Sequence, residues 1–260
     1  MLKNQKDGLS WYTFPLFERC PELRHGVFTR FGGVSGPAGT ELRMSFNSDD
    51  DPDKVRTNIR RAEAVLNVGP SAYVRQTHSA NIAVVRPEDN YRPSGPEDSR
   101  EDYDALLAPE PGPTLLIKVA DCQAVILYDP RTKALALVHS GWRGSVGNII
   151  GAAVARMVDF GVDPAGLLAA VAPSLGPCCA EFVNYREELP ESFWPFQVSE
   201  NHFDFWAISR KQLADSGVRP ENVAVAGVCT KCSGEFFSYR GGDRWPRFGV
   251  MAAVIGENHG

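Results

Sequence analysis

"KVADCQAVILYDPRTKALALVHSGWRG", residues 118 to 144, places a cysteine and a histidine after two apolar runs of strand length. Cys122 follows the run "PTLLIKVA", and His139 follows "ALALV". Both runs contain β-branched or large aliphatic residues, which favours strands over solvent-facing helices. A tight turn with Gly141 and Gly144 then leads into a helical pattern. The stretch therefore predicts strand, glycine turn and helix, with two reactive side chains at strand ends.

Working outward, three segments have helical spacing. In residues 140–161 the apolar positions are Val146, Ile149, Ile150, Val154, Met157 and Val158. Residues 49–69 begin with acidic side chains, which suit a helix N-terminus, and end at a glycine; Val55, Ile59, Ala62 and Leu66 form one face. Residues 205–217 predict a further helix, and the charged, proline-rich residues 86–104 predict a solvated loop. Strands and helices alternate irregularly, so we expect an α+β single domain with mixed sheets.

Composition limits the classes of function. The 260 residues are 43% hydrophobic and carry a net charge of −5, with acidic and basic residues interspersed. No basic footprint for nucleic acid or anionic membrane is present, and no stretch approaches the length of a membrane span. The N-terminus lacks the apolar core of a signal peptide. We expect a cytoplasmic protein that acts on a small soluble molecule.

Six cysteines are too few for a disulfide scaffold in a chain of this length. The "CTKC" of residues 229–232 supplies half of a structural zinc site, but the other close pair, Cys178 and Cys179, has no spacer. The pattern therefore favours free thiols at these four positions.

His78, Cys122 and His139 each stand just after an apolar run. Two imidazoles and a thiolate suit Zn²⁺, and three protein ligands leave a fourth position open, as in catalytic zinc sites. Residue type alone favours hydrogen-bonded edge histidines beside a buried cysteine over a metal site. It also allows Cys122 to be a nucleophile with His139 as its base.

Two stretches are candidates for an anion site. "HSGWRG" places Arg143 at a helix start behind two glycines, where N–H groups and a guanidinium suit phosphate. "FFSYRGGDRWPRFGV" carries Arg240, Arg244 and Arg247 among aromatic residues, which suits an anionic or planar ligand. An ordinary glycine-rich connection with a surface arginine would explain the first stretch equally well, and an ordinary strand followed by a polar turn would explain the second.

A series of motifs, in this order, resembles the laccase-domain family, also called multicopper polyphenol oxidase or peptidoglycan editing factor, whose members are described as purine nucleoside phosphorylases. The motifs are "HGVFTRFGGVSGP" (25–37), "SFN" (45–47), "DDPDKVRTNIRR" (50–61), "QTH" (76–78), "DALL" (104–107), "ADC" (120–122), "HSGWRG" (139–144), "PSLGPCCAEF" (173–182), "CT" (229–230) and "FFSYR" (236–240).

This resemblance implies a layered α/β/β/α single domain and Zn²⁺ held by His78, Cys122 and His139. We expect residues 1–24 to be an N-terminal extension packed on a catalytic domain of residues 25–260. The resemblance also implies phosphorolysis of adenosine, inosine, guanosine or methylthioadenosine, together with adenosine deamination. The partners would be a nucleoside and phosphate, and the chain a monomer or weak homo-oligomer.

The same resemblance suggests further site residues. Arg143 and Arg30 are candidates for phosphate, Ser45 and Asn47 for the sugar or phosphate, and Gln76 for the substrate. Asp121, with Cys122 and His139, is a catalytic candidate that would orient a ligand histidine or handle a proton.

One name of the family refers to copper. A multicopper oxidase needs many histidines to hold several copper centres, and the chain has only five: His25, His78, His139, His202 and His259. We therefore do not expect a multicopper cluster. The remaining alternatives are a Cys/His hydrolase or amidase that edits a peptidoglycan precursor, a polyphenol oxidase, and a metal-stabilised binding protein.

Overall fold

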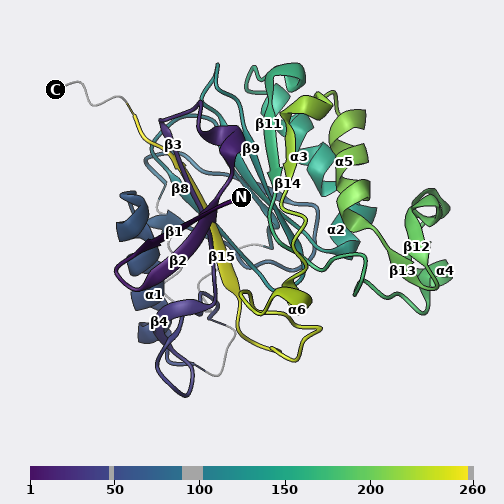
Figure 1. Ribbon diagram of the computed structural model, residues 1–260. Helices are drawn as coiled ribbons and strands as arrows, with labels where there is room; N and C mark the ends of the chain where they lie inside the picture. Colours follow the sequence, from purple (N-terminus) through teal and green to yellow (C-terminus); the bar gives the residue numbers. More distant parts are fainter. Residues whose placement is uncertain (47–49, 90–101, 257–260) are drawn as a thin grey trace.

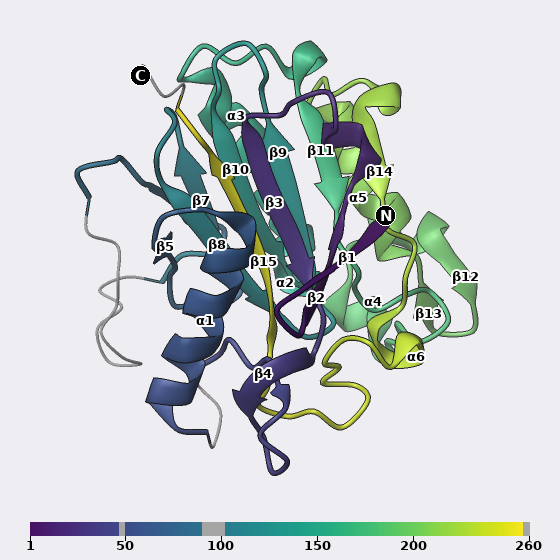
Figure 2. The same cartoon turned by 60° about the vertical axis from the view of Figure 1, so that its left-hand side comes forward.

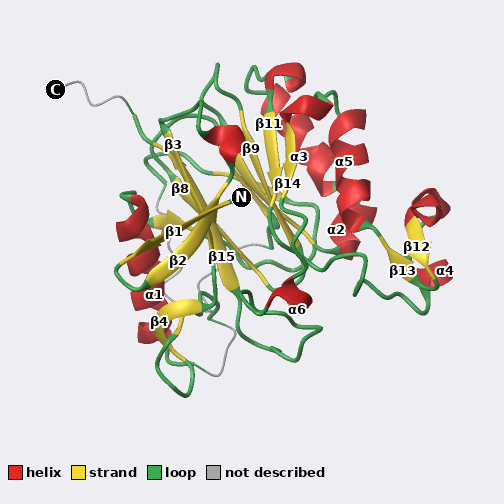
Figure 3. Ribbon diagram, viewed as in Figure 1, coloured by secondary structure: helices red, strands yellow, loops and turns green. Residues whose placement is uncertain are grey.

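Two mixed β-sheets form the centre of the molecule, and helices cover their outer faces (Figures 1 and 3). The computed structural model describes residues 1–46, 50–89 and 102–256. In Figure 1 the helix on one outer face, α1 (Pro52–Leu66), lies on the opposite side of the sheets from α3 (Ile149–Val158) and α5 (Phe205–Asp215). The layered α/β/β/α arrangement predicted above is confirmed.

The first sheet combines strands from the beginning and the end of the chain, because the last strand pairs with the third. Its order is β1 (Leu2–Lys6), β2 (Leu9–Thr13), β3 (Leu23–Phe28), β15 (Phe248–Val254), β8 (Thr114–Val119) and β5 (Ser71–Ala72). All neighbouring pairs are antiparallel except β5 with β8. Figure 2 brings this sheet and α1 forward.

The second sheet carries the strands of the opening sequence. Its order is β14 (Val223–Val225), β11 (Leu168–Val171), β9 (Gln123–Tyr128), β10 (Leu135–Ser140), β7 (Ala105–Ala108) and β6 (Ile82–Val84). The central strands are antiparallel, while each edge strand is parallel to its neighbour.

Both faces of each central strand are buried, which explains the continuous apolar runs. On β8, Leu115 and Ile117 point into the core between the sheets, whereas Leu116 packs beneath α1. On β10, Leu137 faces the inter-sheet core and Val138 faces the helices of the other side. The period of two along a strand thus assigns alternate residues to different layers.

The helix α1 follows the prediction closely. Asp51 caps its N-terminus by accepting a hydrogen bond from the Asp53 N–H, and the four predicted apolar residues are buried. Its C-cap is Asn67, in the left-handed region with φ 54°, rather than the glycine two residues later. The predicted helix over 205–217 is confirmed as α5.

The prediction of a single helix within residues 140–161 is wrong, because the structure has two helices there. The segment is divided into α2 (Trp142–Val146) and α3, because Asn148 adopts φ 50° and its side chain caps α3 at the Gly151 N–H. The break changes the helical phase of Val146 relative to α3, and Val146, predicted to pack inward, is 41% exposed. Val158, also predicted to pack inward, is the last residue of α3 and is 45% exposed.

The remaining elements lie at the periphery. They are β4 (Phe31–Ser35), α4 (Tyr185–Glu188), β12 (Gln197–Ser199), β13 (His202–Phe203), α6 (Thr230–Ser233) and four 3-10 turns (Pro15–Phe17, Pro164–Gly166, Glu191–Phe196, Pro220–Asn222). Most of the predicted loop over 86–104 lies outside the described residues. Within the described ranges, none of the helices has the length and hydrophobicity needed to span a membrane.

Residues 1–24 supply β1 and β2 to the first sheet, and Phe14, Phe17 and Cys20 to the inter-sheet core. The domain boundary placed after residue 24 stays a prediction.

Candidate metal centre and substrate pocket

Three donor side chains converge where the second sheet meets the end of β8. Cys122 lies directly before β9, and His139 lies on β10, whose register pairs it with Ala124 of β9. His78 comes from the loop between β5 and β6. The Cys122 Sγ lies 3.6 Å from His78 Nε2, the two imidazole centroids are 4.9 Å apart, and the candidate ligand atoms of all three lie within 4.8 Å of one another. Neighbouring strand ends thus bring together the residues that the sequence selected.

Asp104, at the start of β7, holds this arrangement in place. Its carboxylate is fully buried and accepts a 2.6 Å hydrogen bond from His139 Nδ1. The same carboxylate accepts the N–H groups of Thr77, His78 and Ser79. With Nδ1 donating to Asp104, Nε2 of His139 carries the lone pair that a metal needs.

The role of orienting a histidine was therefore assigned to the wrong aspartate. Asp121 has φ 86°, and its carboxylate accepts hydrogen bonds from Thr230 Oγ1 at 2.6 Å, Ser238 Oγ at 2.7 Å and the Arg240 N–H at 2.6 Å. These contacts fix the loop that follows α6 against the pocket. The sequence signal for Asp104 was an aspartate directly preceding the fully apolar strand "ALLA".

The centre is electrostatically coupled. Burial opposes ionisation of Cys122, but the charge and hydrogen bond of His139, together with His78, outweigh burial and lower the pKa of the thiol to about 6. Burial also opposes the imidazolium of His139, yet Cys122 and Asp104 raise its pKa to about 9. Without a metal, these shifts favour a thiolate beside an imidazolium. A bound metal would take the place of the Nε2 proton of His139, and the thiolate is the form that binds metals.

Gly141 shows how closely the backbone fits this centre. A Cβ built there would lie 2.5 Å from His78 Cδ2 and 3.0 Å from Cys122 Sγ. Only glycine leaves this space for the donors, and the two-nitrogen, one-sulfur set suits Zn²⁺. The residues present therefore fit a zinc ion with an open fourth position.

Gly141→Ala is expected to weaken zinc binding at least tenfold, since the new methyl group displaces His78 and Cys122 from a common point and such sites tolerate only small shifts of their ligands. Competition with a chromophoric chelator measures the change. Gly166→Ala is the matched control, because a Cβ at Gly166 meets nothing within 4 Å. Equal affinity of the two variants for zinc would contradict the expectation.

The centre lies in a pocket of about 610 Å³, a volume typical of small-molecule sites. Aromatic residues line much of it: Phe46, Tyr73, Trp142, Phe182, Phe205 and Tyr239. Cationic residues line the rest: Arg75, Lys118, Arg143, Arg240 and Arg247. Such a lining suits a planar ligand that carries or accompanies an anion.

Of the predicted substrate residues, Arg143, Ser45 and Gln76 line the pocket. The Arg143 guanidinium stacks over the Trp142 ring at 4.1 Å. The Gln76 amide pairs with both main-chain groups of Lys118, at 2.8 and 2.9 Å, and so ties the loop that carries His78 to β8. Asn47 lies outside the described residues.

The prediction that Arg30 contacts phosphate does not agree with the structure, because Arg30 is not among the residues that line the pocket. Its guanidinium is paired with Glu41 at 3.1 Å and with Asp243 at 3.3 Å, and it stacks over the Phe237 ring at 4.6 Å. Two carboxylates already neutralise this charge, so Arg30 supports the β4 region instead of meeting a phosphate.

Lys118 was not predicted as a site residue, and Arg247 was noted only together with Arg240 and Arg244 as a possible contact for an anionic or planar ligand. Burial lowers the pKa of Arg247, and the charges of Cys122 and Asp121 counteract that effect, which places its guanidinium close to the centre. Of the three arginines noted in residues 236–250, Arg240 and Arg247 line the pocket and Arg244 does not. Lys118 follows "LLI" within a strand, where an apolar residue would be expected.

Fold and site together define a class: a two-sheet α/β protein with a candidate His₂Cys metal centre at the floor of a small-molecule pocket. The chain belongs to the family described as multi-copper polyphenol oxidoreductase laccase, whose model matches residues 24–258.

Relatives agree with this membership. A protein of Bacteroides thetaiotaomicron named purine nucleoside phosphorylase is 31% identical over 90% of this chain and 89% of its own length. One of Deinococcus radiodurans with the same name is 32% identical over 92% and 91%. The crystal structure of YlmD from Geobacillus stearothermophilus is similar with a TM-score of 0.85, at 27% identity, and covers 98% of this chain and 99% of that one.

Proposed function

We propose that the protein is a zinc-dependent purine nucleoside phosphorylase with adenosine deaminase activity, acting on adenosine, inosine, guanosine or methylthioadenosine. The observation that carries the proposal is the convergence of His78, Cys122 and His139 at the floor of a pocket with aromatic and basic walls. The names of the relatives agree with phosphorolysis.

Zinc is preferred to a copper cluster because of the donors. Among the described residues, His25 is turned to the Phe14 N–H at 2.8 Å, and His202 contacts the Glu200 carbonyl at 2.7 Å, so neither reaches the centre. Two imidazoles and one thiolate provide for one ion, whereas oxygen reduction by a multicopper oxidase needs several copper centres.

In phosphorolysis the glycosidic C–N bond breaks, a phosphate oxygen bonds to the anomeric carbon, and the purine nitrogen takes up a proton. The aromatic walls, including Phe182 and Tyr239, would hold the purine by stacking, while Arg143, Arg247 and Lys118 would bind phosphate. When bound, Zn²⁺ would supply Lewis acidity at the pocket floor. We assign Asp121, which is among the residues that line the pocket, to handling the substrate's proton.

The experiment is incubation of zinc-loaded protein with adenosine, with and without phosphate, followed by separation of the products. Adenine and ribose 1-phosphate are expected when phosphate is present, and inosine when it is absent. Dialysis against a chelator should abolish both reactions, and added Zn²⁺ should restore them. If metal-loaded protein forms none of these products, the proposal fails.

One observation favours a second candidate, a Cys/His hydrolase or amidase acting on a peptidoglycan precursor. The low pKa of Cys122 favours a thiolate beside His139, and Asp104 orients His139. The three residues thus have the arrangement of a catalytic triad, with Cys122 as nucleophile, His139 as general base and Asp104 as the orienting carboxylate. Such an enzyme would keep its activity in the presence of a chelator. The same dialysis therefore distinguishes the two candidates.

Lys118 places a cation in the pocket at a cost in stability. Burial lowers the pKa of its ammonium from 10.5 to about 8. Between these values the unfolded chain binds more protons than the folded chain, so this residue makes the free energy of unfolding rise with pH. Lys118→Met is therefore expected to raise the melting temperature at pH 7. The difference in melting temperature between this variant and wild type should narrow above pH 8, because the folded wild-type chain then loses the buried charge.

Thermal denaturation at a series of pH values measures this gap. Lys54→Met, at an exposed position on α1, is the control and should leave the melting temperature close to that of wild type. A gap for Lys118→Met that stays constant with pH would contradict the expectation.

We also propose a cytoplasmic location, which the six free cysteines support, since reducing compartments keep thiols unpaired.

A further inference from the structure

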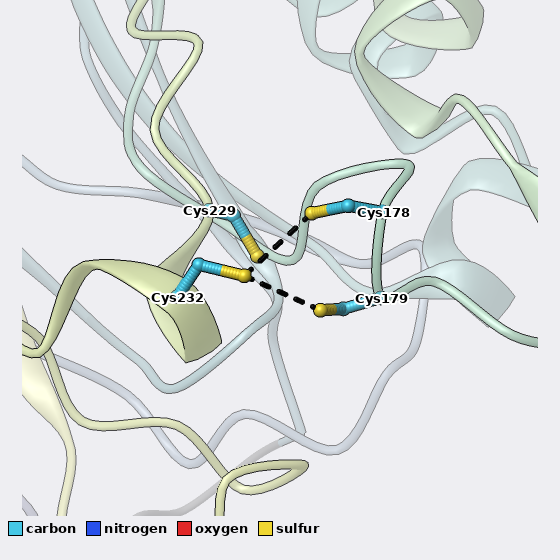
Figure 4. Close-up of side chains that lie close together, drawn as sticks. All are labelled: Cys178, Cys179, Cys229 and Cys232. Atoms are coloured by element: carbon cyan, nitrogen blue, oxygen red, sulfur yellow. Dashed lines mark hydrogen bonds between the residues drawn. The ribbon is translucent and has the colours of Figure 1, made fainter.

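Four cysteines gather beside the pocket at a place that the proposed reaction does not use. Cys178 and Cys179 lie in the turn that follows β11, and Cys229 and Cys232 bracket the first turn of α6. Figure 4 shows the four sulfur atoms pointing toward one another from these two segments. Their candidate ligand atoms all lie within 4.8 Å of one another, with Cys232 Sγ 3.7 Å from Cys178 Sγ and 3.5 Å from Cys179 Sγ.

The backbone is built to bring these segments together. Ser174 and Cys229 form an isolated parallel bridge, and the Thr230 N–H donates to the Ser174 carbonyl at 3.0 Å. A Cβ at Gly176 would lie 2.9 Å from Cys229 Cβ and 2.9 Å from the Trp206 ring. Only glycine at position 176 therefore allows the turn with Cys178 and Cys179 to approach Cys229 so closely.

We propose that Cys178, Cys179, Cys229 and Cys232 form a second metal site, which binds one Zn²⁺ through four thiolates. With zinc–sulfur bonds of about 2.3 Å, a tetrahedral site places neighbouring sulfurs about 3.8 Å apart. The separations of Cys232 Sγ from Cys179 Sγ and Cys178 Sγ, 3.5 and 3.7 Å, are close to that value. A disulfide would instead need sulfurs about 2.05 Å apart, and all four cysteines are free.

Bound zinc would join two segments that shape the pocket. Leu175 and Ala180 flank the Cys178–Cys179 turn and line the pocket, and Thr230 of α6 donates to Asp121. Arg240, also in the pocket wall, donates to the main-chain oxygens of Cys179 and Glu181, so a cation lies beside the electron-rich tetrathiolate. The site would thus be structural, with all four coordination positions filled by protein.

Spacing alone argued for free thiols, because adjacent cysteines do not form a recognised zinc half-site. The structure removes that objection. The turn from Gly176 to Cys179 directs both sulfurs of the adjacent pair toward Cys232, and the partner pair comes from a segment about fifty residues further along the chain.

Metal analysis tests the second site in a background that lacks the first. The His78→Ala/His139→Ala variant, purified with zinc and then desalted, is expected to retain one zinc ion per chain. Adding Cys178→Ser and Cys232→Ser should remove that ion, whereas adding Cys20→Ser, at a buried cysteine outside the cluster, should not. Loss of all zinc from the variant with the two histidine substitutions would overturn the proposal without bearing on the first centre. Zinc retained by the variant that also carries Cys178→Ser and Cys232→Ser would overturn it as well.

Thiol labelling of the wild-type chain gives an answer that needs no variant to fold. Cys178 and Cys232 are exposed, so as free thiols they should react rapidly with N-ethylmaleimide. Both are expected to be protected in zinc-loaded protein and labelled after a chelator is added, as peptide mass spectrometry would show. Equal labelling before and after chelation overturns the site, and so does protection that only a reductant removes, which would indicate a disulfide.

Discussion

His78→Ala is expected to lower kcat/KM for nucleoside cleavage by about 10³-fold or more, because a Lewis acid contributes several kcal/mol to transition-state stabilisation. The variant removes one of the three proposed ligands, and Cys122 and His139 alone would hold a zinc ion poorly. His78 is exposed, so the metal-free fold should change little. Steady-state kinetics with adenosine and phosphate measure the effect. Metal analysis of the same sample is expected to show the loss of one zinc ion per chain, because the four-cysteine site keeps its own.

This substitution also separates the two candidate enzymes. A hydrolase that uses Cys122, His139 and Asp104 would need His78 only for its smaller part in lowering the pKa of Cys122, so most of its activity would survive. His202→Ala is the matched control, since His202 contacts the Glu200 carbonyl in the peripheral β12–β13 hairpin. Nucleoside cleavage at the wild-type rate by a His78→Ala protein that has lost the zinc ion of this centre would rule out the metal mechanism.

The sequence predicted the strand ends that carry the centre because hydrophobic burial leaves a direct trace. Strands covered on both faces appear as unbroken apolar runs, so the positions of Cys122 and His139 follow from where those runs stop. The helix α1 was predictable for a similar reason, since its apolar residues occupy one face.

Other parts of the site depend on contacts between distant segments, which leave no local pattern. Asp104 holds the His78 loop from 26 residues away, and Asp243 neutralises Arg30 from 213 residues away. The four-cysteine cluster likewise depends on the bridge between Ser174 and Cys229. The sequence therefore selected the three side chains that the structure brings together, but it did not find Asp104, which contacts His139, or the two carboxylates that pair with Arg30.

Asp104→Asn is expected to weaken zinc binding about 10- to 100-fold, the range found when a group that orients a metal ligand is changed. The amide presents one oxygen and one NH₂ group. If the NH₂ faces His139, Nδ1 must accept, and Nε2 then carries the proton and cannot bind metal. If the NH₂ faces Thr77 and Ser79 instead, donors oppose donors at a fully buried position. Both orientations disturb the centre.

Chelator competition measures the affinity, and Asp129→Asn provides the matched control. Asp129 is also buried and accepts hydrogen bonds from the Arg131 N–H and Thr132 Oγ1, but its turn follows β9 at the end away from the centre. Both variants should lose stability, since each leaves buried donors poorly satisfied. Only Asp104→Asn should also lose zinc affinity and nucleoside cleavage. Equal zinc affinities in the two variants would show that Asp104 serves the fold and not the metal centre.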